Sequence, residues 1–423
     1  MKISDIAPIS NEEISCMPRF DLEKSPIKAR WYLQLLSWIL SFPETFQVKS
    51  KITRIRMKGL KGPYILLCNH NSFLDFKVAT KAIFPRRANY IVAVDGYIGR
   101  EWLLRNVGGI GKRKFISDPY TFRQVKHCLE VNKSICEIYP EARYSLVGTN
   151  SILPDSLGKL VKVLKYPVVT LISEGHHLRQ PFWNLTKRKV NSKSTINQIL
   201  TKEEIKDKSY NEINQIIREN FVYDDYKYQL DNKIEIDFED RAKGLHKALY
   251  QCPDCLTEFK MKSDKNIIWC ENCNTVHKMN EYGQLFKEDG KALFSHIPDW
   301  FEWQRSKVRE EIKKGEYNVK LDVIIESLPN STGFYRLEDG TLNHDKNGFV
   351  LKNPDFRLEK SILANYGVHI EYDYFGKGDC VSFSTLEDTY YIYPKDQTYS
   401  VTKFHLAVEE LYKLEVNRDG DDL

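Results

Sequence analysis

The chain has 423 residues, which is long for one domain and predicts about two to four. Its 42% hydrophobic content can fill real cores, so the protein is expected to be globular. The formal net charge of +5 is modest for this length, and the mean hydropathy is −0.48. The bulk composition therefore indicates neither an integral membrane protein nor a strongly basic nucleic-acid-binding protein.

The N-terminus shows no pattern of a secretory signal, because acidic residues and Pro8 stand where a basic segment and an apolar stretch would lie. We therefore expect a cytoplasmic protein. Of the nine cysteines, four form two tight pairs. In a reducing compartment this arrangement indicates a metal site rather than a disulfide framework.

The first sustained pattern is RWYLQLLSWILSF, from Arg30 to Phe42, whose polar residues recur at helical spacing on one narrow face. Thirteen helical residues span about 20 Å, less than the roughly 30 Å hydrocarbon core of a bilayer. Basic residues flank this segment on both sides, which favours an anionic lipid surface. We expect residues 1–50 to form an irregular arm and an in-plane membrane helix; the alternative is a helix packed on its own domain.

Residues 51–248 alternate apolar runs with helical patterns, and the runs lie at 64–68, 90–94, 134–139 and 168–172. Strands too apolar to alternate, joined through helices, predict an α/β domain with a mainly parallel sheet flanked by helices. Ligands bind such sheets beyond the carboxyl ends of the strands. Unusual polar residues follow three of the runs there, at 69–70, 141–145 and 174–177.

His70 and Asp75 are separated by four residues, and Ser72 between them is a natural N-cap for the helix that follows. In the first turn of that helix, Asp75 can reach the imidazole of His70. A carboxylate bonded to one ring nitrogen leaves the other nitrogen free to accept a proton, as the base of acyl transfer requires. The alternative is that Ser-x-x-Asp is only a capping box and that His70 satisfies backbone groups.

Four segments together resemble, in order, the sequence blocks of the glycerolipid acyltransferases, a family that includes lysophosphatidic acid acyltransferase. They are NHNSFLD (69–75), GREWLLRNVGGIGKR (99–113), YPEARYS (139–145) and PVVTLI (167–172). The third block departs from the family, because Ala142 replaces the usual glycine and Arg143 stands one position early. The family offers no precedent for the cysteine pairs or for the C-terminal part of the chain.

The resemblance implies a mechanism and a substrate class. His70 would be the general base, Asp75 its orienting carboxylate, and no acyl-enzyme would form. The implied substrate-binding residues are Arg113, Glu141, Arg143, Ser145 and Asn69. Of these, Arg113, Glu141 and Arg143 would position the acceptor's phosphate. The acyl donor would be acyl-CoA or acyl-carrier protein, and the acceptor a lysophospholipid, with 1-acylglycerol-3-phosphate expected first.

Two further expectations concern the surroundings of His70. Backbone N–H groups near the helix that starts at Ser72 are expected to stabilise the oxyanion. His176 and His177, which follow the fourth apolar run, could reach the mouth of the site. The alternative is that these histidines are solvated or packed on an aromatic residue such as Trp183.

The cysteine pairs CPDC and CENC lie fourteen residues apart, a spacing typical of a zinc ribbon, which we place at 249–285. The predicted ligands are Cys252, Cys255, Cys270 and Cys273. Four thiolates close the coordination shell, so the zinc would be structural. The alternative function for the chain is a binding module, in which the ribbon binds nucleic acid or a protein. The acidic residues within the ribbon argue against a nucleic-acid partner, because recognition by charge needs a positive face.

Residues 286–316 are predicted to be a helical linker. The last segment, 317–423, switches to short β-rich runs and ends in an amphipathic helix at about 402–414. Strands closed by one C-terminal helix predict a small barrel or sandwich similar to a pleckstrin-homology domain.

Overall fold

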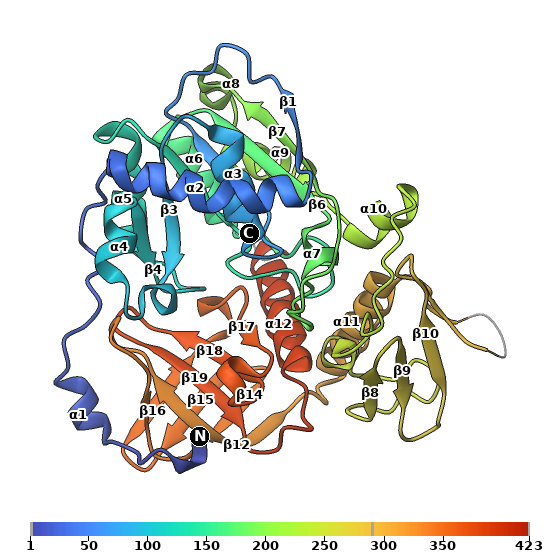
Figure 1. The fold of residues 1–423 in the computed structure, drawn as a ribbon. Coiled ribbons are helices and arrows are strands. Elements are labelled where there is room, and N and C mark those ends of the chain that lie inside the picture. The colour runs from blue at the N-terminus through green and yellow to red at the C-terminus, as the bar shows by residue number, and fades with distance from the viewer. Residues whose placement is uncertain (1–2, 289–291, 422–423) are drawn as a thin grey trace.

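The computed structural model describes residues 3–288 and 292–421 (Figure 1). These residues build three β-sheets: a seven-stranded sheet, a four-stranded sheet and a C-terminal sheet of eight strands. Helix α12 lies between the C-terminal sheet and the seven-stranded sheet (Figure 1).

The seven-stranded sheet has the order β1-β7-β6-β2-β5-β3-β4. Every neighbouring pair is parallel except β6 and β7, so the predicted α/β fold with a mainly parallel sheet is confirmed. The four predicted runs correspond to β2, β3, β5 and β6, whereas β1, β4 and β7 were missed. The strands are β1 (Lys51–Ile55), β2 (Ile65–Cys68), β3 (Ala88–Ala93), β4 (Gly109–Lys112), β5 (Ile135–Ile138), β6 (Val168–Glu174) and β7 (Lys193–Leu200).

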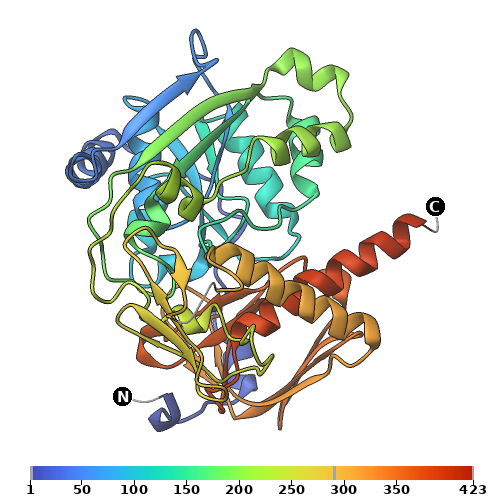
Figure 2. The same ribbon diagram turned by 90° about the vertical axis from the view of Figure 1, so that its right-hand side faces the viewer.

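Helices cover both faces of this sheet. Ile65 and Leu67 of β2 pack toward one face with α5, α6 and α9, whereas Leu66 and Cys68 pack toward α3 on the other. Figure 2 shows α2 end-on at the outside of the second face. The helices are α2 (Trp31–Gln47), α3 (Leu74–Ile83), α4 (Glu101–Asn106), α5 (Pro119–Glu130), α6 (Ser156–Leu164), α7 (His176–Arg179), α8 (Lys202–Asp207), α9 (Tyr210–Glu219) and α10 (Asp225–Asp231).

Helix α2 turns its polar stripe inward and its apolar face outward. Gln34, Ser41 and Thr45 are buried, whereas Trp31 and Ile39 are 69% and 67% exposed. The helix is longer than predicted and continues past Phe42 to Gln47. Pro43 lies inside the helix and has no N–H to donate to the preceding turn. Across residues 3–288 and 292–421, no helix combines the length and apolar character needed to cross a membrane.

The four-stranded sheet is antiparallel and has the order β11-β10-β9-β8. Its strands are β8 (Met261–Asp264), β9 (Ile267–Cys270), β10 (Val276–Met279) and β11 (Leu285–Phe286). Helix α11 (Ile297–Lys314) follows it and packs against α12 (Val401–Asp421).

The C-terminal sheet is antiparallel and curls into a half-barrel with the order β16-β15-β14-β12-β19-β18-β17 (Figure 1). The rings of Phe349 and Phe383 on this sheet contact Phe404 of α12. The predicted β-rich segment closed by a helix is confirmed, although β14, β16 and the short β13 were missed. The strands are β12 (Val319–Ser327), β13 (Tyr335–Arg336), β14 (Gly340–Asp345), β15 (Gly348–Asn353), β16 (Phe356–Lys360), β17 (His369–Glu371), β18 (Cys380–Ser384) and β19 (Thr389–Pro394).

The N-terminal arm is tied to the C-terminal sheet. The backbone N–H of Ile9 donates to the carbonyl of Arg336 at 2.9 Å, and that of Phe20 donates to the carbonyl of Pro329 at 2.9 Å. The arm contains a short helix, α1 (Asn11–Ser15). The part of the chain that the structure describes also contains the single-turn helices η1 (Ile3–Asp5), η2 (Val94–Tyr97), η3 (Leu245–Lys247), η4 (Ile362–Ala364) and η5 (Tyr374–Gly376).

Candidate active site

His70 and Asp75 meet at the carboxyl end of β2. The Nδ1 atom of His70 lies 3.1 Å from Oδ2 of Asp75, and Asp75 is only 2% exposed. The same oxygen accepts the backbone N–H of Asn71 at 2.5 Å and that of Ser72 at 2.9 Å. Asp75 therefore both closes the turn before α3 and holds the imidazole of His70, and the role of His70 as a base stays a prediction.

These backbone bonds correct one expectation. The N–H groups of Asn71 and Ser72 already donate to Asp75, so they are not available to an oxyanion. The hydroxyl of Ser72 accepts the N–H of Leu74 at 3.3 Å, as an N-terminal capping residue does, although α3 itself starts at Leu74.

The second carboxylate oxygen of Asp75 is bonded to a residue outside the four blocks. Its Oδ1 is in contact with Nδ1 of His176, which is fully buried at the start of α7. Burial alone would raise the pKa of Asp75, but hydrogen bonds from His176 and His70 outweigh it and lower this pKa to about 2. Asp75 is therefore anionic at every pH at which the protein is expected to work.

His177 has a different environment from His176. Its ring packs edge-on against Trp183 and Tyr226, with centroid separations of 6.4 and 5.8 Å. Burial is the main reason that the pKa of His177 falls to about 3, so it stays neutral. Packing on an aromatic residue, the alternative stated for this pair, thus describes His177, whereas His176 reaches the site.

Two tyrosines flank the imidazole of His70. The ring centroids of Tyr139 and Tyr144 each lie 4.2 Å from it, and the His70 side chain is 23% exposed. The hydroxyl of Tyr139 donates to Glu137 at 2.6 Å, and burial raises the pKa of Glu137 to about 7. The tyrosines restrict the imidazole between them while leaving part of it accessible.

Glu141 and Ser145 hold the backbone of His70. Glu141 accepts the N–H of His70 at 3.1 Å and that of Ser151 at 2.6 Å, and both its oxygens lie 3.0 Å from the hydroxyl of Tyr223. Ser145 donates its N–H to the carbonyl of His70 at 2.8 Å. Burial raises the pKa of Glu141 to about 7 despite these bonds. No pattern in the sequence pointed to Tyr223, which lies 82 residues from Glu141.

Asn69 joins two strands next to the site. Its side chain donates to the carbonyl of Ser173 and accepts the N–H of the same residue, both at 2.8 Å. These bonds join the end of β2 to β6. The departure at Ala142 also has a structural consequence, because this residue has φ 55°, a left-handed conformation that glycine adopts without strain.

The guanidinium of Arg113 donates hydrogen bonds to residues of the C-terminal sheet and its loops. Arg113 is 1% exposed, and burial lowers its pKa to about 10. Its Nη1 donates at 2.9 Å to the carbonyl of Leu328 and to Oγ1 of Thr389, and its Nη2 donates at 2.8 and 2.7 Å to the carbonyls of Pro329 and Glu387. A phosphate would have to displace these acceptors.

Arg143 points into α12. Its Nη2 donates to Oε1 of Glu409 at 2.7 Å, and its Nη1 contacts the ring of His405. Oε2 of Glu409 also accepts from Nη1 of Arg305 at 2.5 Å. The carboxylate of Glu409 thus takes the place on Arg143 at which an acceptor phosphate was expected.

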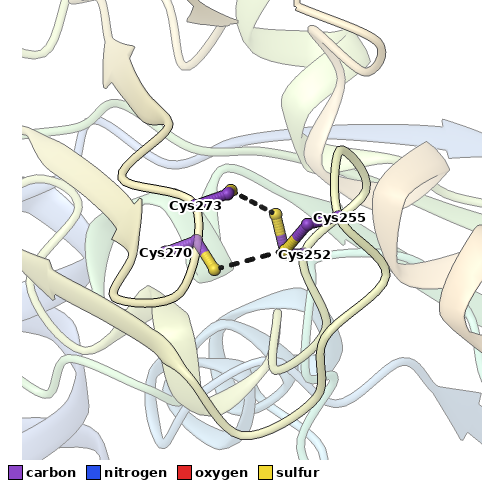
Figure 3. A group of neighbouring side chains, drawn as sticks. All are labelled: Cys252, Cys255, Cys270 and Cys273. Atoms are coloured by element: carbon purple, nitrogen blue, oxygen red, sulfur yellow. Dashed lines mark hydrogen bonds between the residues drawn. The ribbon is translucent and has the colours of Figure 1, made fainter.

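The four paired cysteines converge at one end of the four-stranded sheet, where Cys270 ends β9 and the other three lie in the adjoining loops (Figure 3). Their Sγ atoms all lie within 4.8 Å of one another, with 3.7 Å between Cys252 and Cys273 and between Cys255 and Cys270. Tetrahedral zinc with bonds of about 2.3 Å requires sulfur separations of about 3.8 Å. The cluster therefore fits a metal ion such as zinc.

Comparison with solved structures gives a distant likeness. No family model and no curated protein matches the sequence. The crystal structure of the 1-acyl-sn-glycerophosphate (LPA) acyltransferase PlsC from Thermotoga maritima is similar, with a TM-score of 0.37 and 14% sequence identity. The match covers 45% of this chain and 77% of that one.

Proposed function

We propose that this protein transfers a fatty acyl group from an acyl thioester to the free hydroxyl of a lysophospholipid at a membrane surface. The observation that carries the proposal is the bond between Nδ1 of His70 and the buried carboxylate of Asp75, on a histidine that remains partly accessible. This pairing of a base with an orienting group is the one that hydroxyl activation needs.

The reaction follows from this pairing. Nδ1–H of His70 donates to Asp75, so Nε2 accepts the proton of the acceptor hydroxyl as its oxygen attacks the thioester carbonyl. The tetrahedral intermediate collapses with cleavage of the carbon–sulfur bond, and the imidazolium returns the proton to the leaving thiolate. The anionic Asp75 stabilises the imidazolium while it exists.

The donor in this proposal is acyl-CoA or acyl-carrier protein, and 1-acylglycerol-3-phosphate is the acceptor to test first. Asn69, Glu141 and Ser145 fix the backbone around the base. Phosphate binding by Arg113 and Arg143 remains a prediction and requires the C-terminal part to release them. An acceptor of another kind on the same base is the alternative.

The outward apolar face of α2 supports the membrane part of the proposal. Ile39, Leu40 and Phe46 are 67%, 63% and 66% exposed, an unusual arrangement for three large apolar side chains on one helix. Phe73, three residues after His70, is 62% exposed as well. We propose peripheral attachment to the cytoplasmic surface of a membrane through these side chains.

A substrate panel tests the proposed function. Purified protein is incubated with radiolabelled acyl-CoA, or acyl-carrier protein, and with lysophospholipids that differ in head group, next to a monoacylglycerol that lacks phosphate. We expect labelled diacyl product from wild type, and little or none from His70→Ala and Asp75→Ala. Equal product from all three proteins would rule out the mechanism, and absence of product with every acceptor would rule out the activity.

A further inference from the structure

The two carboxylate oxygens of Asp75 contact two different histidines, His70 and His176. Oδ2 accepts from His70 and from two backbone N–H groups, whereas Oδ1 is in contact with Nδ1 of His176. Both Asp75 and His176 are buried, at 2% and 0% exposure. Without His176, Oδ1 would lose this bond in a place that water does not reach, so the carboxylate would be free to rotate away from His70.

The position of His176 is fixed by its backbone. Asp225 accepts the N–H groups of Gly175 at 3.0 Å and of His177 at 2.8 Å, on both sides of His176. Gly175 has φ 88°, and a Cβ added there would lie 2.9 Å from the carbonyl oxygen of Asn191. The chain can therefore turn sharply after β6 and bring His176 back over Asp75.

The other ring nitrogen of His176 adds no further contact. Within residues 3–288 and 292–421, its buried Nε2 has no hydrogen-bond partner. The imidazole of His176 is therefore tied to its surroundings through Nδ1, which is in contact with Oδ1 of Asp75.

We infer that His176 is a positioning residue for the base: it fixes Asp75 through Oδ1 so that Oδ2 stays aimed at His70. This inference rests on the proposed function, since it assigns a role within the same reaction. It adds to the pairing of His70 and Asp75, because the fully buried His176 contacts the carboxylate of Asp75 through the oxygen that does not bind His70.

The test compares two substitutions of His176 with one of its neighbour. The amide of His176→Asn can place a donor near the position of Nδ1, whereas His176→Leu fills similar space without a donor. His177→Leu is the matched control, because His177 is equally buried in α7 and packs on aromatic rings. We expect kcat of His176→Leu to fall about tenfold or more, with KM nearly unchanged. His176→Asn should recover much of the wild-type kcat. His177→Leu should keep the wild-type kcat.

A second readout does not depend on activity. In protein labelled with ¹³C at the histidine rings, the His70 resonance is assigned by its loss in His70→Gln. We expect this resonance to shift in His176→Leu and to return toward its wild-type position in His176→Asn. The inference would be overturned if His176→Leu changed neither the His70 resonance nor kcat. It would also be overturned if His176→Leu and His177→Leu lost the same fraction of kcat. If wild type has no acyl-transfer activity, the proposed function fails, and the resonance alone still decides whether His176 fixes the pair.

Discussion

Arg143 of the α/β part and Glu409 of α12 form a buried ion pair, with Nη2 of the arginine 2.7 Å from Oε1 of the glutamate. Glu409 is shared with Arg305, and its pKa is held far below the usual value, because these cations and His405 outweigh the effect of burial. This pair joins the C-terminal part of the chain to the loop that holds the backbone of His70.

The ion pair predicts a link between α12 and acceptor binding. In Glu409→Gln, Arg143 loses its anionic partner, so an acceptor phosphate would compete with an amide instead of a carboxylate. We expect a severalfold lower KM for 1-acylglycerol-3-phosphate and little change for a neutral monoacylglycerol, together with a loss of about 3–5 kcal/mol of stability. Enzyme kinetics and denaturant unfolding measure the two effects.

Glu410→Gln is the matched control for that experiment. Glu410 is equally buried on α12, but it pairs with Arg305, Arg309 and Lys413 and makes no bond to Arg143. The Glu410→Gln variant should lose stability, but its KM for 1-acylglycerol-3-phosphate should stay close to that of wild type. A similar change in KM in both variants, or in neither, would contradict the link.

Part of the site could be read from the sequence, because its members are close along the chain. The contact of His70 with Asp75 follows from a strand end and a first helical turn, and the cysteine cluster follows from the two Cys-x-x-Cys spacings. Arg143 could not be assigned a partner, because Glu409 lies 266 residues away. Such pairs depend on how separate layers pack, which local periodicity does not encode.

The same distinction explains the errors in the fold. β7 forms an antiparallel ladder with β6, but its sequence, KSTINQIL, carries polar residues among the apolar ones and follows a basic segment. Only its pairing partners make it a strand of the sheet. The inward polar stripe of α2 was visible as a helical repeat, but which of its faces meets the protein depends on packing.

The exposed face of α2 predicts membrane binding. Ile39→Glu puts a charge where we expect an apolar side chain to enter the lipid. Without the apolar Ile39 side chain to bury in the membrane, the free energy of binding should weaken by about 1.5–3 kcal/mol. The fraction of protein that floats with anionic vesicles should therefore fall about tenfold or more. Val163→Glu, at a 62% exposed apolar position on α6, is the control and should bind like wild type. Equal flotation of wild type, Ile39→Glu and Val163→Glu would contradict membrane binding through the exposed face of α2.

The cysteine cluster predicts one bound zinc per chain, measured by elemental analysis of protein purified from metal-replete cells. Cys252→Ser should lose the metal and several degrees of Tm, because a structural site stabilises the fold to which it is bound. Cys16→Ser, at an exposed cysteine outside the cluster, should keep both. Full stability of Cys252→Ser without metal would contradict a structural role.

Glu141 predicts a pH dependence of stability. Its pKa is raised from 4.5 to about 7 in the folded protein, first of all by burial. The stability that this group contributes is therefore fully present below pH 4.5 and is lost as the pH rises through about 7. Glu141→Gln does not ionise, so it should lose less stability than wild type between pH 5 and pH 8.

Urea unfolding of both proteins at the two pH values measures this difference. Glu137 and Asp225, whose pKa values burial likewise raises to about 7, are present in both proteins and cancel in the comparison. A parallel loss of stability in wild type and Glu141→Gln would contradict the raised pKa of Glu141.

The most direct test of the account is the release of thiol from acyl-CoA that depends on the acceptor, compared between wild type and His70→Ala. His127→Ala, at a half-buried histidine on α5, is the matched control. Removing a general base should lower kcat by about 10²–10⁴ while Tm stays close to that of wild type. His127→Ala should behave as wild type. Turnover by His70→Ala within about twofold of wild type would contradict the assignment of His70 as the base.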